Sequence, residues 1–417
     1  YDNGRAFLSA AAGKSLSGDV KRAYDALIPV IRAIASGERA NATVTVGYDL
    51  GYLTFGDGTS GTYNAEVDVA FDGTTFEQED LDTLTAALLA DLPYELYWFN
   101  KITGLASMAV VSNSRLNITF AFPVAANYRG ADTYTVNTVK TGAAKSTAEA
   151  ANAVVERVAA DENVKTDYDI LMAYKDWICE ATEYNDAAAE NGNFASNSDP
   201  WQLIYVFDGN VSTTVVCEGY SKAFQYLCDL TEFEDQNAEC YSVTGNFESG
   251  IVEGPHMWNI MKLDGAYYMV DVTNSDTYTV GDDGSLFMVG TTPNASGSYT
   301  FGSSTYTYDQ ITENLWANTS VLTLATSSYE PKEVGTDVEE SNPETSGMTW
   351  TYDESGKTLT ISGAGPMDDY EIDDSGIYNA PWQDVTNDIQ YVVVEEGITH
   401  IGDYAFANCY NVQSITL

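Results

Sequence analysis

The sequence predicts an α+β fold divided into several domains, and three observations lead to that prediction. The chain has 417 residues, more than one hydrophobic core usually organises. Apolar residues recur at helical spacing in some segments and alternate with polar residues in others. The composition, with 44% hydrophobic and 12% aromatic residues, is typical of a folded chain rather than a disordered one.

The charge and the hydropathy pattern exclude several classes of partner. The chain has 62 acidic and 18 basic residues. It should repel nucleic acid and anionic membrane surfaces, because phosphate binding needs clustered Lys and Arg. No apolar run is long enough to span a bilayer, so we expect no transmembrane segment. The chain starts at Tyr1, and its Thr-, Ser-, Asn- and Tyr-rich texture suggests an extracellular or cell-surface bacterial protein whose signal peptide has been removed.

Residues 1–145 are expected to form an N-terminal α+β domain. Helical periodicity and strand-like alternation predict two helices and two strands, in the order Val20–Ile34, Asn41–Gly47, Leu81–Leu92 and Arg115–Phe122. Pro93 should stop the second helix. The region contains neither His nor Cys. We therefore expect a structural or recognition role for it rather than catalysis.

Residues 146–326 are expected to form a second domain, and it begins with Ala- and Glu-rich helices. The periodicity predicts helices over Ser146–Ala160 and Asp167–Ala181. The polar stretch Asn185–Ser198 is predicted to be a loop. A further helix should begin near Asp199-Pro200-Trp201, because Ser198 or Asp199 can cap it and Pro fits the first turn.

Residues 327–347 are predicted to be an acidic, Pro-bearing linker, and residues 348–417 have a different texture. Met348–Ile361 is typical of a hairpin that turns at Glu354-Ser355-Gly356. The pattern of Ile389–Val394 recurs in Val412–Leu417 at an offset of 23 residues, within the range of leucine-rich repeats. With Ala380-Pro381-Trp382, this region resembles the bacterial surface (BspA-like) leucine-rich repeats. Because one repeat and a fraction cannot close a solenoid, we expect the sequence to continue past Leu417.

Cys217 is the candidate nucleophile of the second domain. It follows a Thr/Val stretch and precedes apolar residues at helical spacing, so we expect it at the start of a helix. The backbone amides and dipole at that end favour a thiolate and can stabilise an oxyanion. Gly219 would permit close packing of the first turn. Cys228 lies about 16 Å further along the helix, too far for a disulfide with Cys217. The alternative for Cys217 alone is a buried structural thiol.

His256 and Asp271 are the candidate partners of this thiol. Asp264-Gly265 predicts a two-residue hairpin loop between strands His256–Leu263 and Ala266–Thr273. With that loop, Asp271 is the diagonal neighbour of His256 on one face, where a carboxylate would fix the imidazole tautomer. A three-residue loop would put the two on opposite faces. Taken singly, His256 could be a core or surface residue and Asp271 a strand-end cap.

The histidine count narrows the kinds of site that this domain can build. The chain has two histidines, His256 and His400, and His400 lies in the repeat region. Any site in the second domain that uses His must therefore use His256. A zinc centre would need histidines from two domains, and no pair of cysteines has CxxC spacing, so we expect no metal.

Three motifs together resemble the transglutaminase-like superfamily. They are Cys217-Glu218-Gly219-Tyr220, His256-Met257-Trp258-Asn259, and the run from Asp264-Gly265 to Asp271-Val272-Thr273, in that order. The resemblance implies a papain-like α+β core, with Cys217 as nucleophile, His256 as general base and acid, and Asp271 as orienting carboxylate. It implies packing roles for Trp258 and Tyr220. The oxyanion-binding side chain varies in this superfamily, and it is not assigned to Gln202 or Trp201, which lie upstream of Cys217. We expect a structural role for Trp201.

The resemblance also implies a reaction class. Cys217 would attack a peptide or glutamine carboxamide and form a thioester, with no cofactor and no metal. Water would resolve the thioester in a peptidase or amidase, which we favour, and an amine would resolve it in a protein-glutamine acyltransferase. The expected partners are a protein or peptide substrate and, through the repeats, a cell-surface or host protein. The alternative is a non-catalytic adhesion or binding protein that carries the same domains.

Overall fold

The computed structural model divides the chain into two compact units, Tyr1–Glu330 and Pro331–Leu417. The structure describes residues 11–49, 53–54, 60–61, 78–112, 115–191, 202–331, 348–353, 356–363, 365–367, 370, 380–395 and 398–416. Most of the predicted linker, residues 332–347, lies outside the described residues. So do residues 198–201, where the sequence predicts a helix start.

The first part of unit 1 combines helices with a three-stranded antiparallel sheet of order β1-β5-β4. The elements are α1 (Ala11–Ser15), α2 (Gly18–Ala35), β1 (Thr43–Asp49), β2 (Leu53–Thr54), β3 (Ser60–Gly61), α3 (Gln78–Asp91), β4 (Ala106–Ser112), β5 (Arg115–Ala121) and the 3₁₀ helix η1 (Ala126–Tyr128). The two predicted helices and two predicted strands are confirmed to within a few residues. The helix α2 buries one face, with Ala23, Leu27, Ile31 and Ile34 fully covered.

Further helices follow, and side chains cap the starts of several of them. They are α4 (Thr138–Ala159), α5 (Asp167–Ala181), α6 (Asp186–Asn191), the 3₁₀ helix η2 (Leu203–Tyr205), α7 (Cys217–Asp229) and α8 (Gln310–Trp316). The helix α4 starts eight residues before the predicted Ser146, because the Asn137 side chain accepts from the amides of Val139 and Lys140. The start of α5 is as predicted, with a capping box between Thr166 and Asp169.

One predicted loop is partly helical. The sequence predicts a loop over Asn185–Ser198, whereas residues 186–191 form α6. The side chain of Asn185 accepts a hydrogen bond from the amide of Ala188 at 3.0 Å, which caps a short Ala-rich helix. The prediction over these residues is therefore wrong, because the Asn read as a loop residue acts as a helix cap.

The second part of unit 1 is built on a five-stranded antiparallel sheet of order β8-β7-β6-β10-β9. The strands are β6 (Glu239–Ser249), β7 (Val252–Leu263), β8 (Ala266–Val270), β9 (Tyr299–Phe301) and β10 (Ser304–Tyr308), with the 3₁₀ helix η3 (Thr273–Ser275) after β8. Asp264 and Gly265 both have positive φ, 51° and 78°, as a two-residue hairpin loop requires. The predicted pairing of Leu263 with Ala266 is confirmed.

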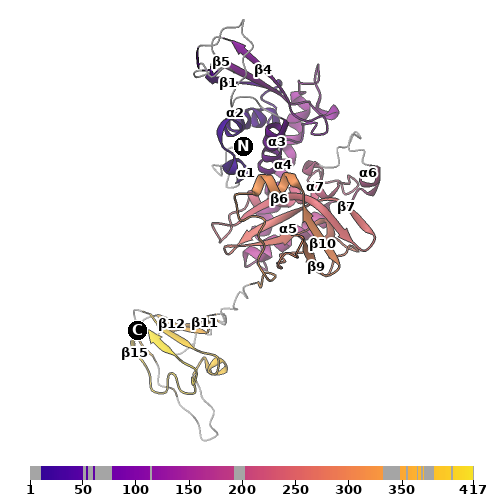
Figure 1. Cartoon of the computed structure of the whole chain (residues 1–417). Helices are drawn as coiled ribbons and strands as arrows, with labels where there is room; N and C mark the ends of the chain where they lie inside the picture. The colour runs from indigo at the N-terminus through magenta and orange to yellow at the C-terminus, as the bar shows by residue number, and fades with distance from the viewer. Residues whose placement is uncertain are drawn as a thin grey trace. The chain divides into compact units, whose positions relative to one another are not determined.

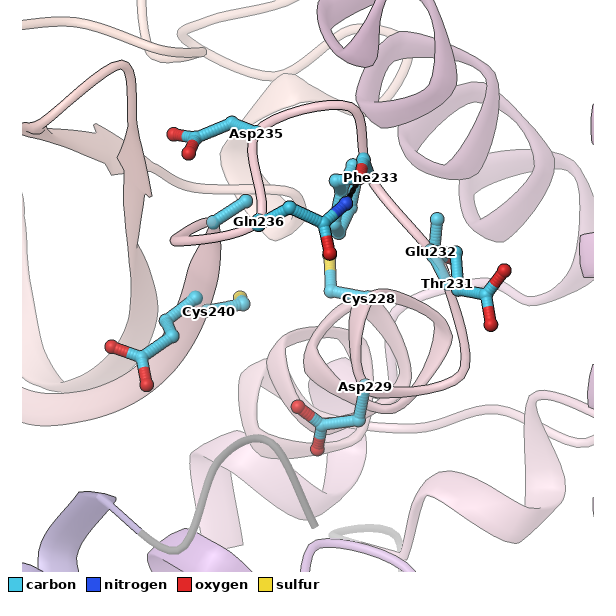
Figure 2. A pocket seen from close by; sticks show the side chains of 10 residues that line it. Cys228, Asp229, Thr231, Glu232, Phe233, Asp235, Gln236 and Cys240 are labelled. Carbon is cyan, nitrogen blue, oxygen red and sulfur yellow. Dashed lines mark hydrogen bonds between the residues drawn. The ribbon is translucent and has the colours of Figure 1, made fainter. Parts of the chain in front are cut away.

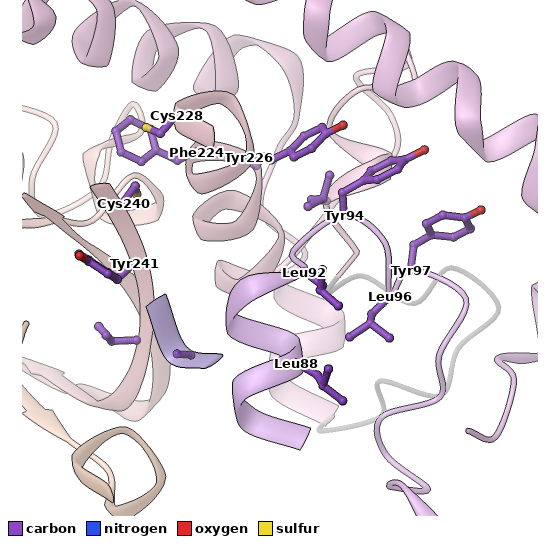
Figure 3. Packing of buried hydrophobic residues seen from close by; sticks show 14 of the residues in the cluster. Leu88, Leu92, Tyr94, Leu96, Tyr97, Phe224, Tyr226, Cys228, Cys240 and Tyr241 are labelled. Carbon is purple, nitrogen blue, oxygen red and sulfur yellow. The ribbon is translucent and has the colours of Figure 1, made fainter. Parts of the chain in front are cut away.

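One large hydrophobic cluster extends through both parts of unit 1. Figure 3 shows residues of α3 and the segment after it, including Leu88, Tyr94 and Tyr97, in one cluster with Phe224 and Tyr226 of α7. The rings of Tyr94 and Tyr226 stack with centroids 5.0 Å apart. Figure 1 shows α1 to α4 between the three-stranded and the five-stranded sheet. The boundary predicted near residue 145 falls inside α4, and the division of roles between residues 1–145 and 146–326 stays a prediction.

Unit 2 is a small sheet of order β11-β12-β14-β16 with a short parallel pair, β13 and β15. Its elements are β11 (Met348–Asp353), β12 (Thr358–Gly363), β13 (Gly365–Pro366), η4 (Gln383–Val385), β14 (Tyr391–Val394), β15 (Ile398–His400) and β16 (Ser414–Thr416). The predicted hairpin is confirmed by the antiparallel pairing of β11 with β12. The strands β14 and β16 are parallel and pair Tyr391 with Ser414, which is the predicted offset of 23 residues.

The core of unit 2 is centred on Trp382, which is fully buried. Its indole N–H donates to the carbonyl of Ala405 at 2.9 Å. This bond joins the Ala-Pro-Trp segment to the turn before β16, so it ties one repeat to the next.

Both α-helices and strands are therefore present, and the predicted α+β class is confirmed. Within the described part of the chain, no helix is both long enough and apolar enough to cross a membrane.

Candidate active site

Cys217 is the first residue of α7, as the sequence predicts. The preceding Val216 has an extended backbone, with φ −94° and ψ 178°. The strand-like segment before it is held by residues 183–185, because the Val215 amide donates to the Glu183 carbonyl and the Asn185 amide donates to the Val215 carbonyl. The Cys217 side chain is partly exposed. A thiol is thus presented at the amide end of a helix of 13 residues.

The first turns of α7 pack closely on their surroundings. A Cβ atom at Gly219 would lie 2.6 Å from the Cβ of Val215, so a larger residue would push the helix start away. Further along, the Ser221 hydroxyl donates to the Met257 carbonyl at 2.9 Å, and the Asn259 amide donates to the Ser221 carbonyl at 3.0 Å. These bonds dock α7 on β7, the strand that carries His256. The close packing predicted for Gly219 is confirmed.

His256 and Asp271 are in direct contact. The Nε2 atom of the imidazole lies 2.8 Å from Oδ2 of the carboxylate. His256 is on β7, and Asp271 follows the last residue of β8 with its side chain fully buried. Because Nε2 is engaged by the carboxylate, Nδ1 is the ring nitrogen left for the thiol.

The Asp271 carboxylate accepts three further hydrogen bonds. Asn274 donates its backbone amide to Oδ1 at 3.1 Å and its side-chain amide to Oδ2 at 2.7 Å. The hydroxyl of Tyr306, on β10, donates to Oδ2 at 2.7 Å. Sequence reasoning missed both residues. Asn274 lies three residues after Asp271, a spacing that favours local bonding to a carboxylate, whereas nothing near Tyr306 in the sequence points to Asp271.

The charges of the pair stabilise one another. Burial lowers the pKa of His256, but the Asp271 carboxylate and the Cys217 side chain, which hydrogen-bonds to the ring, raise it to about 10. Burial raises the pKa of Asp271, but the His256, Asn274 and Tyr306 donors lower it below its ordinary value. An imidazolium at neutral pH therefore lies next to the Cys217 side chain at the start of α7.

The hairpin differs from the prediction at its end. The sequence predicts that the returning strand runs to Thr273, opposite His256, whereas β8 ends at Val270 and residues 273–275 form η3. The amide of Asp271 donates to the Leu286 carbonyl, and Met269 pairs with Val289. These bonds join the edge of β8 that faces away from β7 to residues 286–289. Asp271 therefore reaches His256 from the position immediately after the end of β8.

Aromatic side chains surround the three residues. Trp258 and Tyr220 are buried, consistent with the packing roles predicted for them. The Trp258 ring stacks on the His256 ring with centroids 6.1 Å apart. Tyr184, which the sequence reading missed, lies 6.4 Å from the ring of Tyr220. Burial raises the pKa of Tyr184, and its neighbour Cys217 raises it further, while the Cys217 backbone amide opposes the rise.

A buried ion cluster lies directly after the candidate nucleophile. Glu218 forms salt bridges with Lys222 at 2.7 Å and with Lys101, which comes from the segment before β4. Lys222 is almost fully buried. Burial raises the pKa of Glu218, but the two lysines lower it to about 2. The cluster thus connects the N-terminal part of unit 1 to the start of α7.

Gln202, Trp201, His400 and Cys228 are the other residues that the sequence singles out. Gln202 is buried just before η2, and Trp201 lies outside the described residues. His400 belongs to β15 of unit 2. Cys228 is near the other end of α7 from Cys217. In the part of the chain that the structure describes, no group of three or more His, Cys, Asp or Glu side chains is placed to hold a metal ion.

Comparison with known proteins gives distant similarities. No family model matches the chain. Over 115 residues, 27% of this chain, the sequence is 27% identical to the Kyphoscoliosis peptidase of Homo sapiens, a protein of a transglutaminase-like family. The match spans 16% of that protein, so the chain covers about a sixth of the length of this curated relative. This similarity supports a transglutaminase-like domain in the chain.

Two solved structures also match in part. One, described as the crystal structure of a TGase, is 15% identical over 43% of this chain and 47% of its own, with a TM-score of 0.26. The other is a leucine-rich repeat protein from Eubacterium ventriosum. It is 38% identical over 17% of this chain and 18% of its own, with a TM-score of 0.15.

Proposed function

We propose that the chain is an extracellular or cell-surface thiol enzyme that transfers acyl groups, with Cys217, His256 and Asp271 as its catalytic residues. The observation that carries the proposal is the 2.8 Å bond between His256 and the buried Asp271, formed beside the thiol of Cys217. The buried carboxylate, held by three other donors, can fix the orientation of the imidazole and stabilise its charged form, as a Cys–His–Asp triad requires.

In the proposed mechanism, the Cys217 thiolate attacks a carbonyl carbon of the substrate. The helix-start amides face the oxygen that becomes negative, and they stabilise it by hydrogen bonding. The imidazolium of His256 then gives its proton to the leaving amine, and a thioester remains on the sulfur. Asp271 holds the ring through Nε2, so that Nδ1 stays directed to the reacting atoms.

The thioester is resolved by water in a peptidase or amidase and by an amine in a crosslinking acyltransferase. We favour the peptidase, which agrees with the name of the human relative. The proposed substrate is a protein or peptide, since an amide carbonyl is the electrophile that a thiol–imidazole pair attacks without a cofactor.

A second candidate function is binding through unit 2. The strand β16 is the last strand of its sheet, and its three residues are exposed, including Ile415 at 46%. An exposed edge strand can pair with a further repeat or with a partner protein. The alternative proposal is thus a surface adhesion protein in which the transglutaminase-like domain does not catalyse.

Alkylation distinguishes the two proposals. We expect iodoacetamide to modify Cys217 much faster than Cys179, with a pH-dependent rate, and we expect the His256→Ala variant to lose this advantage. Peptide mapping by mass spectrometry measures both rates in one sample. Labelling of Cys217 no faster than Cys179 in the wild type would favour the binding protein.

The reaction type needs a second measurement. The protein is incubated with a peptide library, with and without a primary amine, and the products are identified by mass. Hydrolysed peptides that are absent with Cys217→Ala indicate a peptidase, whereas incorporated amine indicates an acyltransferase. If neither product forms and the alkylation of Cys217 is slow, the enzyme proposal is contradicted.

A further inference from the structure

A second pair of sulfur atoms lies at the opposite end of α7 from the candidate nucleophile. Cys228 is the penultimate residue of α7, and Cys240 is the second residue of β6. Figure 2 shows the two side chains at the same small pocket, one on the helix and one on the strand. The pocket has a volume of about 40 Å³ and is lined by the two cysteines and by residues of the loop that joins the two elements.

The two thiols are in contact with each other. The side chain of Cys240 hydrogen-bonds to the side chain of Cys228. Both are buried, with 1% and 5% of their surface exposed. A disulfide requires the sulfurs to approach to about 2 Å. The two sulfurs would have to move together from their present contact to form that bond.

The backbones on which the two cysteines sit are held at a fixed separation. The Ser242 hydroxyl of β6 donates to the Gln225 side chain of α7 at 2.7 Å. Asn259 on the neighbouring strand β7 donates to the Ser221 carbonyl of α7 and to the Ser242 hydroxyl. The helix and the sheet are therefore docked beside the cysteine pair, so that a covalent bond there would be compatible with the fold.

We propose that Cys228 and Cys240 are a disulfide-forming site that joins the end of α7 to β6. The co-reactant is a small disulfide such as oxidised glutathione. One protein thiolate attacks it, a mixed disulfide forms, and the second protein thiol displaces the remaining glutathione. Two protein thiols are oxidised to one S–S bond and the small disulfide is reduced to two thiols, so that electrons and protons balance.

The bond forms while the loop of residues 229–239 is still open. In the folded protein, burial and the neighbouring Cys228 thiol raise the pKa of Cys240, which disfavours the attacking thiolate. The same burial protects the bond from reductant once the loop has closed. The site is thus structural rather than a rapid switch, and it does not depend on the activity proposed for Cys217.

Oxidative refolding of the full chain tests the proposal. The protein is unfolded with reductant, refolded in a glutathione redox buffer, and then alkylated under denaturing conditions. We expect two of its five cysteines to resist alkylation. The mass should also be about 2 Da below that of the fully reduced chain, corrected for the alkyl groups. The segment between the cysteines has no Lys or Arg, so a protease that cleaves at Glu or Asp is needed to obtain the linked peptides.

Single Cys→Ser variants identify which two cysteines are linked. Cys228→Ser and Cys240→Ser should each leave all remaining cysteines open to alkylation, whereas the control Cys179→Ser should keep the linked pair. The oxidised wild type should melt at a higher temperature than the reduced form, because the bond restricts the unfolded chain. Alkylation of all five cysteines after oxidative refolding, or a link that includes Cys217, would overturn the proposal. The mass of the wild-type chain shows whether a disulfide has formed, even where a variant does not fold.

Discussion

At the scale of single residues, Asp271 has the most demanding environment in the candidate site. Its carboxylate is fully buried and accepts bonds from His256, Asn274 and Tyr306. A buried carboxylate without such donors would take up a proton. These donors therefore keep Asp271 charged, and the charge in turn keeps His256 protonated.

Tyr306→Phe tests this dependence. The variant removes one donor to Oδ2 and leaves the ring in place, so we expect the free energy of unfolding to fall by about 1.5–3 kcal/mol. The control is Tyr308→Phe, two residues along β10, whose hydroxyl is not among the donors to Asp271. Urea unfolding at neutral pH measures the free energy of unfolding of both variants. Equal losses in the two variants would contradict a special role for Tyr306.

The pKa of His256 predicts a dependence of stability on pH. Because its pKa rises from about 6.5 in the unfolded chain to about 10 in the folded protein, its stabilisation is complete below about pH 6.5. It should be lost as the pH rises towards 10. The pKa of Asp271 is lowered, so its contribution is present above about pH 4 and lost as the pH falls below that.

Urea unfolding of the wild type and of His256→Gln across this pH range isolates the effect. The difference between their free energies of unfolding should shrink steadily between about pH 6.5 and 10. A difference that stays constant over that interval would show that His256 does not titrate as its surroundings indicate.

At the scale of elements, α7 is held from two sides. Bonds from Ser221 and Asn259 dock it on β7. The pair of Glu218 with Lys101 ties its first turn to the segment before β4. The N-terminal part of unit 1 therefore contributes directly to the position of the helix that carries Cys217.

Lys101→Met tests this link. It leaves the buried Glu218 with Lys222 as partner, so we expect a loss of about 1–3 kcal/mol in unfolding free energy. The control Lys14→Met removes a pair with Glu239 at 3.8 Å in which the lysine is exposed, and it should cost about 0–1 kcal/mol. Urea unfolding measures the loss of unfolding free energy in each of the two variants. If Lys101→Met is no more costly than the control, the cluster does not hold α7.

Gly245→Ala tests the packing between β6 and its neighbours. A Cβ atom there would collide with the Thr307 carbonyl on β10 and come within 2.7 Å of the Trp258 ring. Because backbone cannot yield as a flexible side chain can, we expect a loss of about 1–3 kcal/mol or more. Gly254→Ala on β7 is the matched control, since a Cβ atom there meets nothing within 4 Å. Thermal unfolding of the two variants gives the comparison.

At the scale of the whole molecule, the chain consists of two compact units with separate cores. The core of unit 1 is formed by residues from α1 to the segment after α8. Cys217, His256 and Asp271 all belong to unit 1. The three candidate catalytic residues therefore lie in one compact unit.

Residues 1–330 made alone should fold, with the melting temperature of the corresponding transition in the full chain. They should also keep the rate at which iodoacetamide modifies Cys217. Calorimetry and peptide mapping measure the two properties. A lower melting temperature or a slower reaction in the shortened chain would mean that unit 2 supports the site.

Much of the local structure could be predicted from the sequence. Helical periodicity located α2, α3 and α5, and Asp264-Gly265 located the hairpin that brings β8 back beside β7. The 23-residue recurrence located the parallel pairing of β14 with β16. The missed helix α6 and the early end of β8 show the limit of this reasoning. The start of α6 is capped by a hydrogen bond from the Ala188 amide to the Asn185 side chain, and the Asp271 amide after β8 donates to the Leu286 carbonyl. Hydrophobic periodicity predicts neither bond.

The sequence by itself determined the elements and drew attention to Cys217, His256 and Asp271, because turn chemistry and periodicity act over a few neighbouring residues. The tertiary structure alone decided which distant side chains meet them. Tyr306 reaches Asp271 across 35 residues, Lys101 reaches Glu218 across 117, and Cys240 meets Cys228 across a closed loop. Such contacts depend on how whole segments pack, and packing is set by the shape and burial of many side chains together.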